Sequence, residues 1–120
     1  MEERREMTPA GDYTAIIAGV RVEDLDSGSK VLILQFVVAR GPHRGEGCQK
    51  LLYLGFDAEQ EAKVRFARMG AALRSLATVR EDAQGLVGSL LAIRIRYDDA
   101  DRQKVLILRS HGRDDVQKYR

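Results

Sequence analysis

A strand pattern gives way to a helix pattern within residues 46–76, which read EGCQKLLYLGFDAEQEAKVRFARMGAALRSL. Residues 46–54 end in a run of apolar side chains and predict a strand. Over residues 58–76 the apolar side chains recur every three or four positions, which predicts an amphipathic helix. Asp57 is expected to cap the start of this helix, with Gln60 completing a capping box. The apolar positions of the helix are Ala62, Phe66, Met69, Leu73 and Leu76.

Four further strands are predicted around this segment, two before it and two after it. A turn at Asp26-Ser-Gly-Ser29 joins the first two, and Gly19 predicts a bulge or sharp bend within the first. Five strands with one helix between the third and fourth is the order of the OB-fold, a small barrel. The expected fold class is therefore mainly β, a five-stranded OB-fold-like barrel with one α-helix between strands 3 and 4. The four strands are expected over residues 11–23, 30–40, 89–97 and 104–110.

Length and composition predict one globular domain. The chain has 120 residues, of which 44% are hydrophobic and 32% charged, as is typical of soluble proteins. We expect a flexible tail over residues 1–8, the OB-fold-like domain over 9–112, and a second flexible tail over 113–120. No apolar run approaches the roughly 20 residues of a membrane helix, and no secretory signal is recognisable. The single cysteine, Cys48, excludes an internal disulfide and favours a cytoplasmic protein.

The second predicted strand is apolar on both faces. Leu32, Leu34, Phe36 and Val38 alternate along one face and are expected to form core. The opposite face, which includes Ile33, is unusually apolar for a surface. A strand that is apolar on both faces must be covered on both, so we expect self-association into a homo-oligomer unless the helix and tails cover it.

No pattern in the sequence predicts catalysis. Walker A, dinucleotide-binding and nucleophile-elbow motifs are absent. A pair of Cys48 with His43 would lack an orienting third group, and Asp98, Asp99 and Asp101 are expected to form a solvated turn rather than a metal site. We therefore expect a protein that is not an enzyme, with no cofactor and no metal.

Short motifs in a fixed order carry a family resemblance. They read PAGDY at 9–13, SGSK at 27–30, LILQF at 32–36, GPHRG at 41–45, LYL at 52–54 and LVGS at 86–89. Their order and spacing, over residues 9 to 112, resemble a family of small phage and prophage proteins that is usually labelled as a domain of unknown function. Members occur among phage replication and recombination proteins and are thought to bind single-stranded DNA.

The resemblance implies a non-catalytic single-stranded-DNA-binding protein that acts in replication or recombination in the cytoplasm of a bacterial host. It also implies a possible replication or recombination protein as partner. The chain departs from the family pattern at Gln49, where an aromatic or bulky apolar residue is common, and in the shorter loop 98–103.

Binding a single strand requires a basic groove for the phosphates and flat side chains that stack on bases. In an OB-fold the usual surface is the face of strands two and three with the adjoining loops. Tyr53 is the first stacking candidate, against a role in the core or an interface, and Phe56 is the second. Arginines in the fourth strand either contact phosphates or belong to a solvated barrel wall. The predicted nucleic-acid-binding residues are Arg40, His43, Arg44, Lys50, Tyr53, Arg94, Arg96, Lys104 and Arg109.

Two other functions stay open. The net charge is only +2, and the loop tips carry aspartates that repel phosphate. A protein-binding adaptor on the same fold, using its apolar sheet faces, is the main alternative. A structural or still unassigned small β-barrel is the other.

Overall fold

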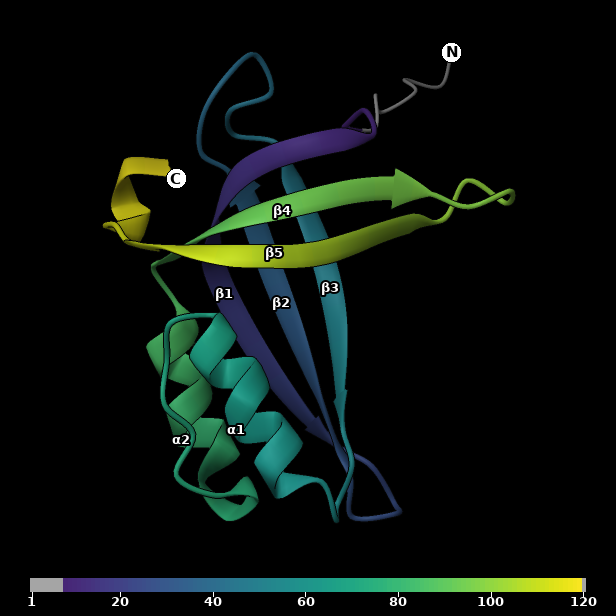
Figure 1. Ribbon diagram of the computed structural model, residues 1–120, viewed down its shortest axis with the longest axis vertical. Coiled ribbons are helices and arrows are strands. Elements are labelled where there is room, and N and C mark those ends of the chain that lie inside the picture. The colour runs from purple at the N-terminus through teal and green to yellow at the C-terminus, as the bar shows by residue number, and fades with distance from the viewer. Residues whose placement is uncertain (1–7, 120) are drawn as a thin grey trace.

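The structure, a computed structural model, describes residues 8–119. The flexible tail expected over residues 1–8 lies outside the described residues, except for Thr8. Five strands and two short α-helices form the fold, together with three 3-10 turns (Figure 1). The strands are β1 (Gly11–Asp24), β2 (Lys30–Val38), β3 (Gly47–Leu54), β4 (Ser89–Tyr97) and β5 (Gln103–Arg113). The helices are α1 (Glu59–Arg68) and α2 (Val79–Asp82), and the 3-10 turns are Leu76–Thr78, Ala83–Leu86 and Val116–Tyr119.

The strands form one antiparallel sheet in the order β3-β2-β1-β4-β5, which curls strongly into a half-barrel. β1 is long enough to pair with β4 through residues 11–16 and with β2 through residues 15–24. Its register with β2 shifts between Ile17 and Gly19, which confirms the expected bulge. Because β1 bends, β4 and β5 cross in front of the upper parts of β2 and β3 (Figure 1). The mainly β prediction with five strands is confirmed, and the curl is compatible with an OB-like fold.

The helical region between β3 and β4 differs from the single long helix that the sequence predicted. α1 ends at Arg68, and Gly70 follows with a φ of +80°. That left-handed conformation suits glycine and terminates the helix. The chain then forms a 3-10 turn, α2 and a second 3-10 turn before β4. The expected cap was also wrong: Ala58, not Asp57, occupies the N-cap position and makes no side-chain capping bond.

The core lies on the concave side of the sheet, between the strands and α1. The second strand behaves as its alternation predicted, with Leu32, Leu34, Phe36 and Val38 all buried. Phe66 of α1 packs into the same cluster. Met69 and Leu73 are also buried there, although both lie beyond the end of α1. The predicted apolar positions therefore reach the core, but through a broken rather than a continuous helix.

A smaller apolar cluster lies on the convex side of the sheet. Ile16 of β1, Leu90 of β4, Ala39 and Val116 are buried together. Val116 belongs to the C-terminal 3-10 turn, which lies within the segment expected as a flexible tail over residues 113–120. Residue 120 lies outside the described part of the chain.

Hydrogen bonds hold the C-terminal turn in place. The Asp114 backbone N–H donates to the Gly88 carbonyl (2.9 Å). The Asp114 carboxylate accepts from the Tyr119 hydroxyl (2.7 Å) and from the Lys118 ammonium (2.9 Å). The hydrogen bonds from Tyr119 and Lys118, with one from the Asp115 backbone N–H, lower the pKa of the Asp114 carboxyl to about 2.

Candidate nucleic-acid interface

The two edge strands of the half-barrel, β3 and β5, lie next to each other without pairing. Among residues 8–119 the sheet pairings join neighbours in the order given above, and none joins β3 to β5. Instead, the Lys50 ammonium of β3 donates to the Val105 carbonyl of β5 (2.6 Å). Lys50 pairs with the core residue Leu34, so its side chain starts on the inner face of the sheet and spans the opening. We call this opening between β3 and β5 the seam.

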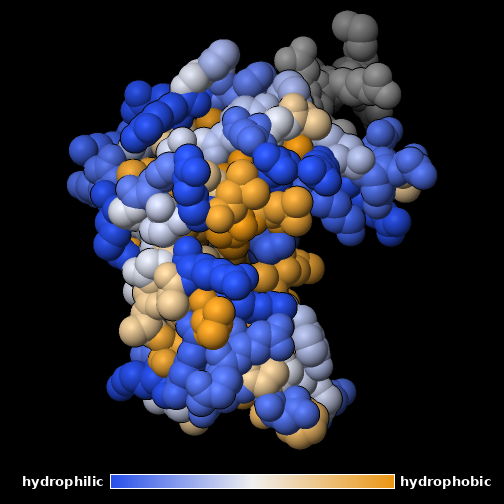
Figure 2. All heavy atoms as spheres, viewed as in Figure 1, coloured by the Kyte–Doolittle hydropathy of each residue, from blue (hydrophilic) through white to orange (hydrophobic). Residues whose placement is uncertain are grey.

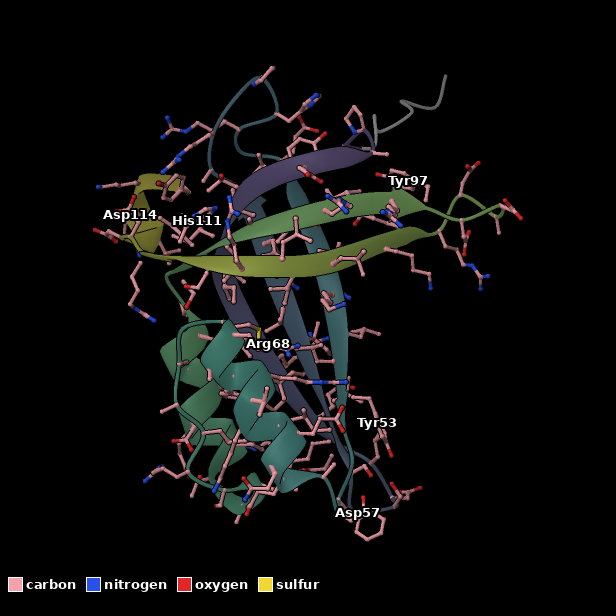
Figure 3. The ribbon with its side chains drawn as sticks, in the orientation of Figure 1. Tyr53, Asp57, Arg68, Tyr97, His111 and Asp114 are labelled. Atoms are coloured by element: carbon pink, nitrogen blue, oxygen red, sulfur yellow. The ribbon has the colours of Figure 1, made fainter. Side chains whose placement is uncertain are left out.

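A groove of about 260 Å³ lies at the seam, bounded by β3, β5 and α1. Its side chains are of two kinds, apolar and cationic, and no carboxylate lines it. Figure 2 shows this side of the molecule hollowed at mid-height, with hydrophobic residues in the hollow and hydrophilic ones beside them. Arg68 lies at the end of α1 that approaches β5 (Figure 3). The groove is lined by Lys50, Leu52, Arg65, Arg68, Met69, Leu106 and Ile107.

The positive charges of the groove are poorly compensated. Burial lowers the pKa of Lys50, and the nearby positive charges of Arg65 and Lys104 lower it further. Within residues 8–119, Arg68 and Lys104 form no ion pair. Arg65 donates to the Tyr53 carbonyl (3.0 Å) and pairs with Glu61 (2.8 Å). An anion in the groove would therefore meet several donors whose mutual repulsion it would relieve.

Tyr53 lies at the lower end of β3, beside the groove (Figure 3). It pairs with Val31 and points to the outer face of the sheet, where the side chain is 57% exposed. Its hydroxyl donates to Ser29 Oγ (2.8 Å), and that oxygen also accepts the Phe56 backbone N–H (3.2 Å). The ring is thus fixed at its hydroxyl end but open to solvent, as a stacking surface requires. Phe56, the second stacking candidate, is 65% exposed.

The predicted residues of β4 and β5 lie on a different wall. Arg94 and Arg96 of β4 share the outer face with Lys104 of β5, since Arg96 pairs with Lys104. Arg94 is neutralised by two hydrogen bonds to the Asp12 carboxylate (2.7 and 3.1 Å), which raise the pKa of Arg94 and lower that of Asp12. Arg96 and Arg109 are exposed and form no ion pair with described residues. Of this wall, Lys104 is close enough to affect the pKa of Lys50 at the seam.

The predicted residues of the β2–β3 loop lie at the opposite end of β3 from Tyr53 (Figures 1 and 3). His43 Nδ1 is 2.6 Å from the Glu46 carboxylate, and its ring meets Tyr13 edge-on at 5.9 Å. Arg44 lies over the Tyr119 ring, 5.4 Å from its centroid, while Arg40 is exposed. The structure thus brings Lys50, Lys104 and Tyr53 to the seam and leaves the other predicted residues on separate surfaces.

Arg65 and Arg68 were not among the binding residues predicted from the sequence, although both line the groove. Their spacing in the sequence could have indicated a shared site, because arginines three positions apart in a helix lie on neighbouring parts of its surface. Both flank the apolar stripe of α1. The sequence alone does not show that this side of α1 faces β5, because β5 begins more than thirty residues after α1 ends.

The remaining chemistry of the described residues is limited. Burial raises the pKa of Cys48 to about 11, so its thiol stays protonated. Residues 8–119 contain no cluster of three or more histidine, cysteine or acidic side chains that would hold a metal ion. In the same part of the chain, no helix has the length and apolar character needed to cross a membrane.

Comparison with known proteins adds no identification. The sequence matches no protein-family model and no curated protein. The resemblance to the phage protein family therefore rests on the sequence motifs alone.

Proposed function

We propose that this protein binds single-stranded DNA without catalysis, as an OB-fold protein acting in phage or prophage DNA replication or recombination. The observation that carries the proposal is the seam groove, in which Lys50, Arg65 and Arg68 gather without a lining carboxylate. An exposed tyrosine ring stands at its lower end. Phosphates would follow the cations while a base stacks on Tyr53.

The strand order supports the OB-fold part of the proposal. A five-stranded OB-fold is a partly open Greek-key barrel. In this sheet β1 is central, β3 and β5 are the edges, and Lys50 links those edges through the Val105 carbonyl. The half-barrel therefore has the arrangement expected of such a barrel with its last side open.

Fluorescence anisotropy tests the proposal. A labelled thirty-nucleotide oligo-dT is titrated with protein at low and moderate salt, with duplex DNA as competitor. We expect salt-sensitive binding that duplex does not displace. Arg68→Glu reverses a charge in the groove and should weaken binding about tenfold or more, because each lost phosphate contact also becomes a repulsion.

Lys63→Glu is the matched control. Lys63 lies on the same helix and carries the same charge, but it does not line the groove. The two variants change the net charge equally, so only a contact within the groove distinguishes them. Equal loss of affinity in both variants would contradict binding at the seam, and no binding even at low salt would overturn the proposed function.

A second candidate function is that of an adaptor for a replication or recombination protein. It is favoured by leucines that are exposed near the seam, Leu51 on β3 and Leu106 and Leu108 on β5. A homo-oligomer that covers these side chains also stays a proposal, and sizing with light scattering tests it. Charge reversal at Arg68 also separates the two functions, since it should weaken DNA binding and leave a purely apolar interface intact.

A further inference from the structure

The upper end of β3 borders a second, larger cavity that differs in chemistry from the groove. Its volume is about 730 Å³, within the range of roughly 300 to 1,000 Å³ that small-molecule sites occupy. The lining residues come from β1, β2, β3 and the start of β5, together with Thr8 and Glu46. The cavity at Gly47–Gln49 and the groove at Lys50–Leu52 follow one another along the same strand.

The cavity is unsuited to phosphate. No lysine or arginine lines it, and Glu46 contributes a carboxylate. Both oxygens of that carboxylate are occupied, one by the Thr8 hydroxyl (2.9 Å) and the other by His43 Nδ1 (2.6 Å). A carboxylate with no lysine or arginine beside it in the lining disfavours a phosphate but admits a neutral, polar group.

Three glutamines line the cavity. The Gln103 amide donates to the Tyr97 hydroxyl (3.0 Å), so the recognition chemistry comes from the other two. Gln35 of β2 and Gln49 of β3 are paired in register, so their side chains leave the same face of the sheet next to each other. Both are exposed, and neither amide forms a hydrogen bond with the described residues. Each amide offers one acceptor and two donor hydrogens.

Adenine fits a pair of neighbouring amides better than thymine does. Its amino group N6 carries two hydrogens and lies between two acceptors, N1 on the Watson–Crick edge and N7 on the Hoogsteen edge. An amide can therefore form a bidentate pair on each edge, as glutamine does with adenine N6 and N7 in duplex DNA. Thymine offers one such edge. Unstacked bases of a single strand expose both edges to side chains.

We propose that the Gln35–Gln49 cavity is an adenine-preferring base pocket at the upper end of the DNA path. This inference rests on the proposed function, because it assumes that a single strand follows β3 from the groove. The strand would place phosphates on the groove cations and a base between the amides, and the protein would favour adenine there over thymine.

The test compares oligo-dA and oligo-dT of equal length by anisotropy, for wild type and for the double variant Gln35→Met, Gln49→Met. Methionine keeps the length of the side chain and removes the amide. Self-stacking of oligo-dA affects both proteins equally, so the ratio of the two affinities is compared between proteins. We expect the variant to lose dA preference by about tenfold or more while its affinity for dT changes little.

Two controls sharpen the result. Gln60→Met removes an exposed amide on α1 that does not line the cavity, and it should leave the ratio unchanged. Oligonucleotides containing 7-deaza-adenine lack only the N7 acceptor, so wild type should bind them more weakly than oligo-dA while the double variant should not distinguish them.

The outcomes separate the inference from the function on which it rests. Loss of the dA preference in the double variant, with dT binding retained, supports the pocket. Salt-sensitive dT binding with a dA-to-dT ratio that is the same in both proteins overturns the pocket and leaves the proposed function standing. Absence of binding to every oligonucleotide at low salt overturns both.

Discussion

Tyr53 combines two interactions that mutation can separate. Its ring is exposed, while its hydroxyl donates to the buried Ser29 Oγ. Tyr53→Phe keeps the ring and loses the hydrogen bond, so it should cost about 1 kcal/mol of unfolding free energy and leave DNA affinity almost unchanged. Tyr53→Ala also removes the stacking surface and should weaken oligo-dT binding about tenfold or more.

Anisotropy and thermal melts measured on the same two variants check this prediction. Equal losses of affinity in Tyr53→Phe and Tyr53→Ala would mean that the hydroxyl, and not the ring, is what the DNA requires. The ring would then be a structural feature of the β3 end.

Single residues were predictable where strand alternation alone determines their position. Alternation placed Tyr53 and Lys50 on opposite faces of β3, and the register with β2 agrees. It did not show that Lys50 would cross the seam to Val105, because that contact joins residues that are far apart in the sequence. Nor did it show that Arg94 is neutralised, since its partner Asp12 is supplied by β1.

At the scale of elements, the strands were predictable and the helical connection was not. Alternation and turn residues mark strands locally, and β4 has its expected limits. The helix was expected to continue to residue 76 because its apolar spacing continues. Gly70, at φ +80°, ends it early, and the buried side chains beyond it are held by the core rather than by helical geometry.

The C-terminal turn is an element whose stability should depend on pH. Its Asp114 has a pKa of about 2, against an ordinary value of 3.8. As pH falls, the unfolded chain therefore takes up the proton first, so the stabilisation is complete above about pH 4 and disappears toward pH 2. Asp114→Asn should lower the melting temperature at pH 7, and the difference from wild type should close by pH 2.

Melting temperatures followed by circular dichroism from pH 7 to pH 2 measure this effect. Asp99→Asn serves as control, because Asp99 is exposed and forms no ion pair within residues 8–119. A gap between wild type and Asp114→Asn that stays constant with pH would show that the carboxylate charge does not hold the turn.

For the whole molecule, the placement of charge matters more than its sum. A net charge of +2 predicts little attraction for a polyanion. The curl of the sheet nevertheless brings Lys50, Lys104 and the two arginines of α1 to one side of the molecule. Within residues 8–119 only Arg65 of these four has a carboxylate partner, whereas Arg94 on the other wall is neutralised by Asp12. Composition could not reveal this separation, because it arises only when β5 crosses β3.

The salt dependence of binding should report this cluster directly. If four cations meet phosphates of a single strand, the logarithm of the affinity should fall against the logarithm of salt concentration with a slope of about −3. Arg68→Gln should make the slope shallower by about 0.7, whereas Lys63→Gln should leave it unchanged. Anisotropy titrations at several salt concentrations give all three slopes. A slope near zero in wild type would show that the groove cations do not contact phosphate, and the apolar surface around the seam would then be the better guide to a partner.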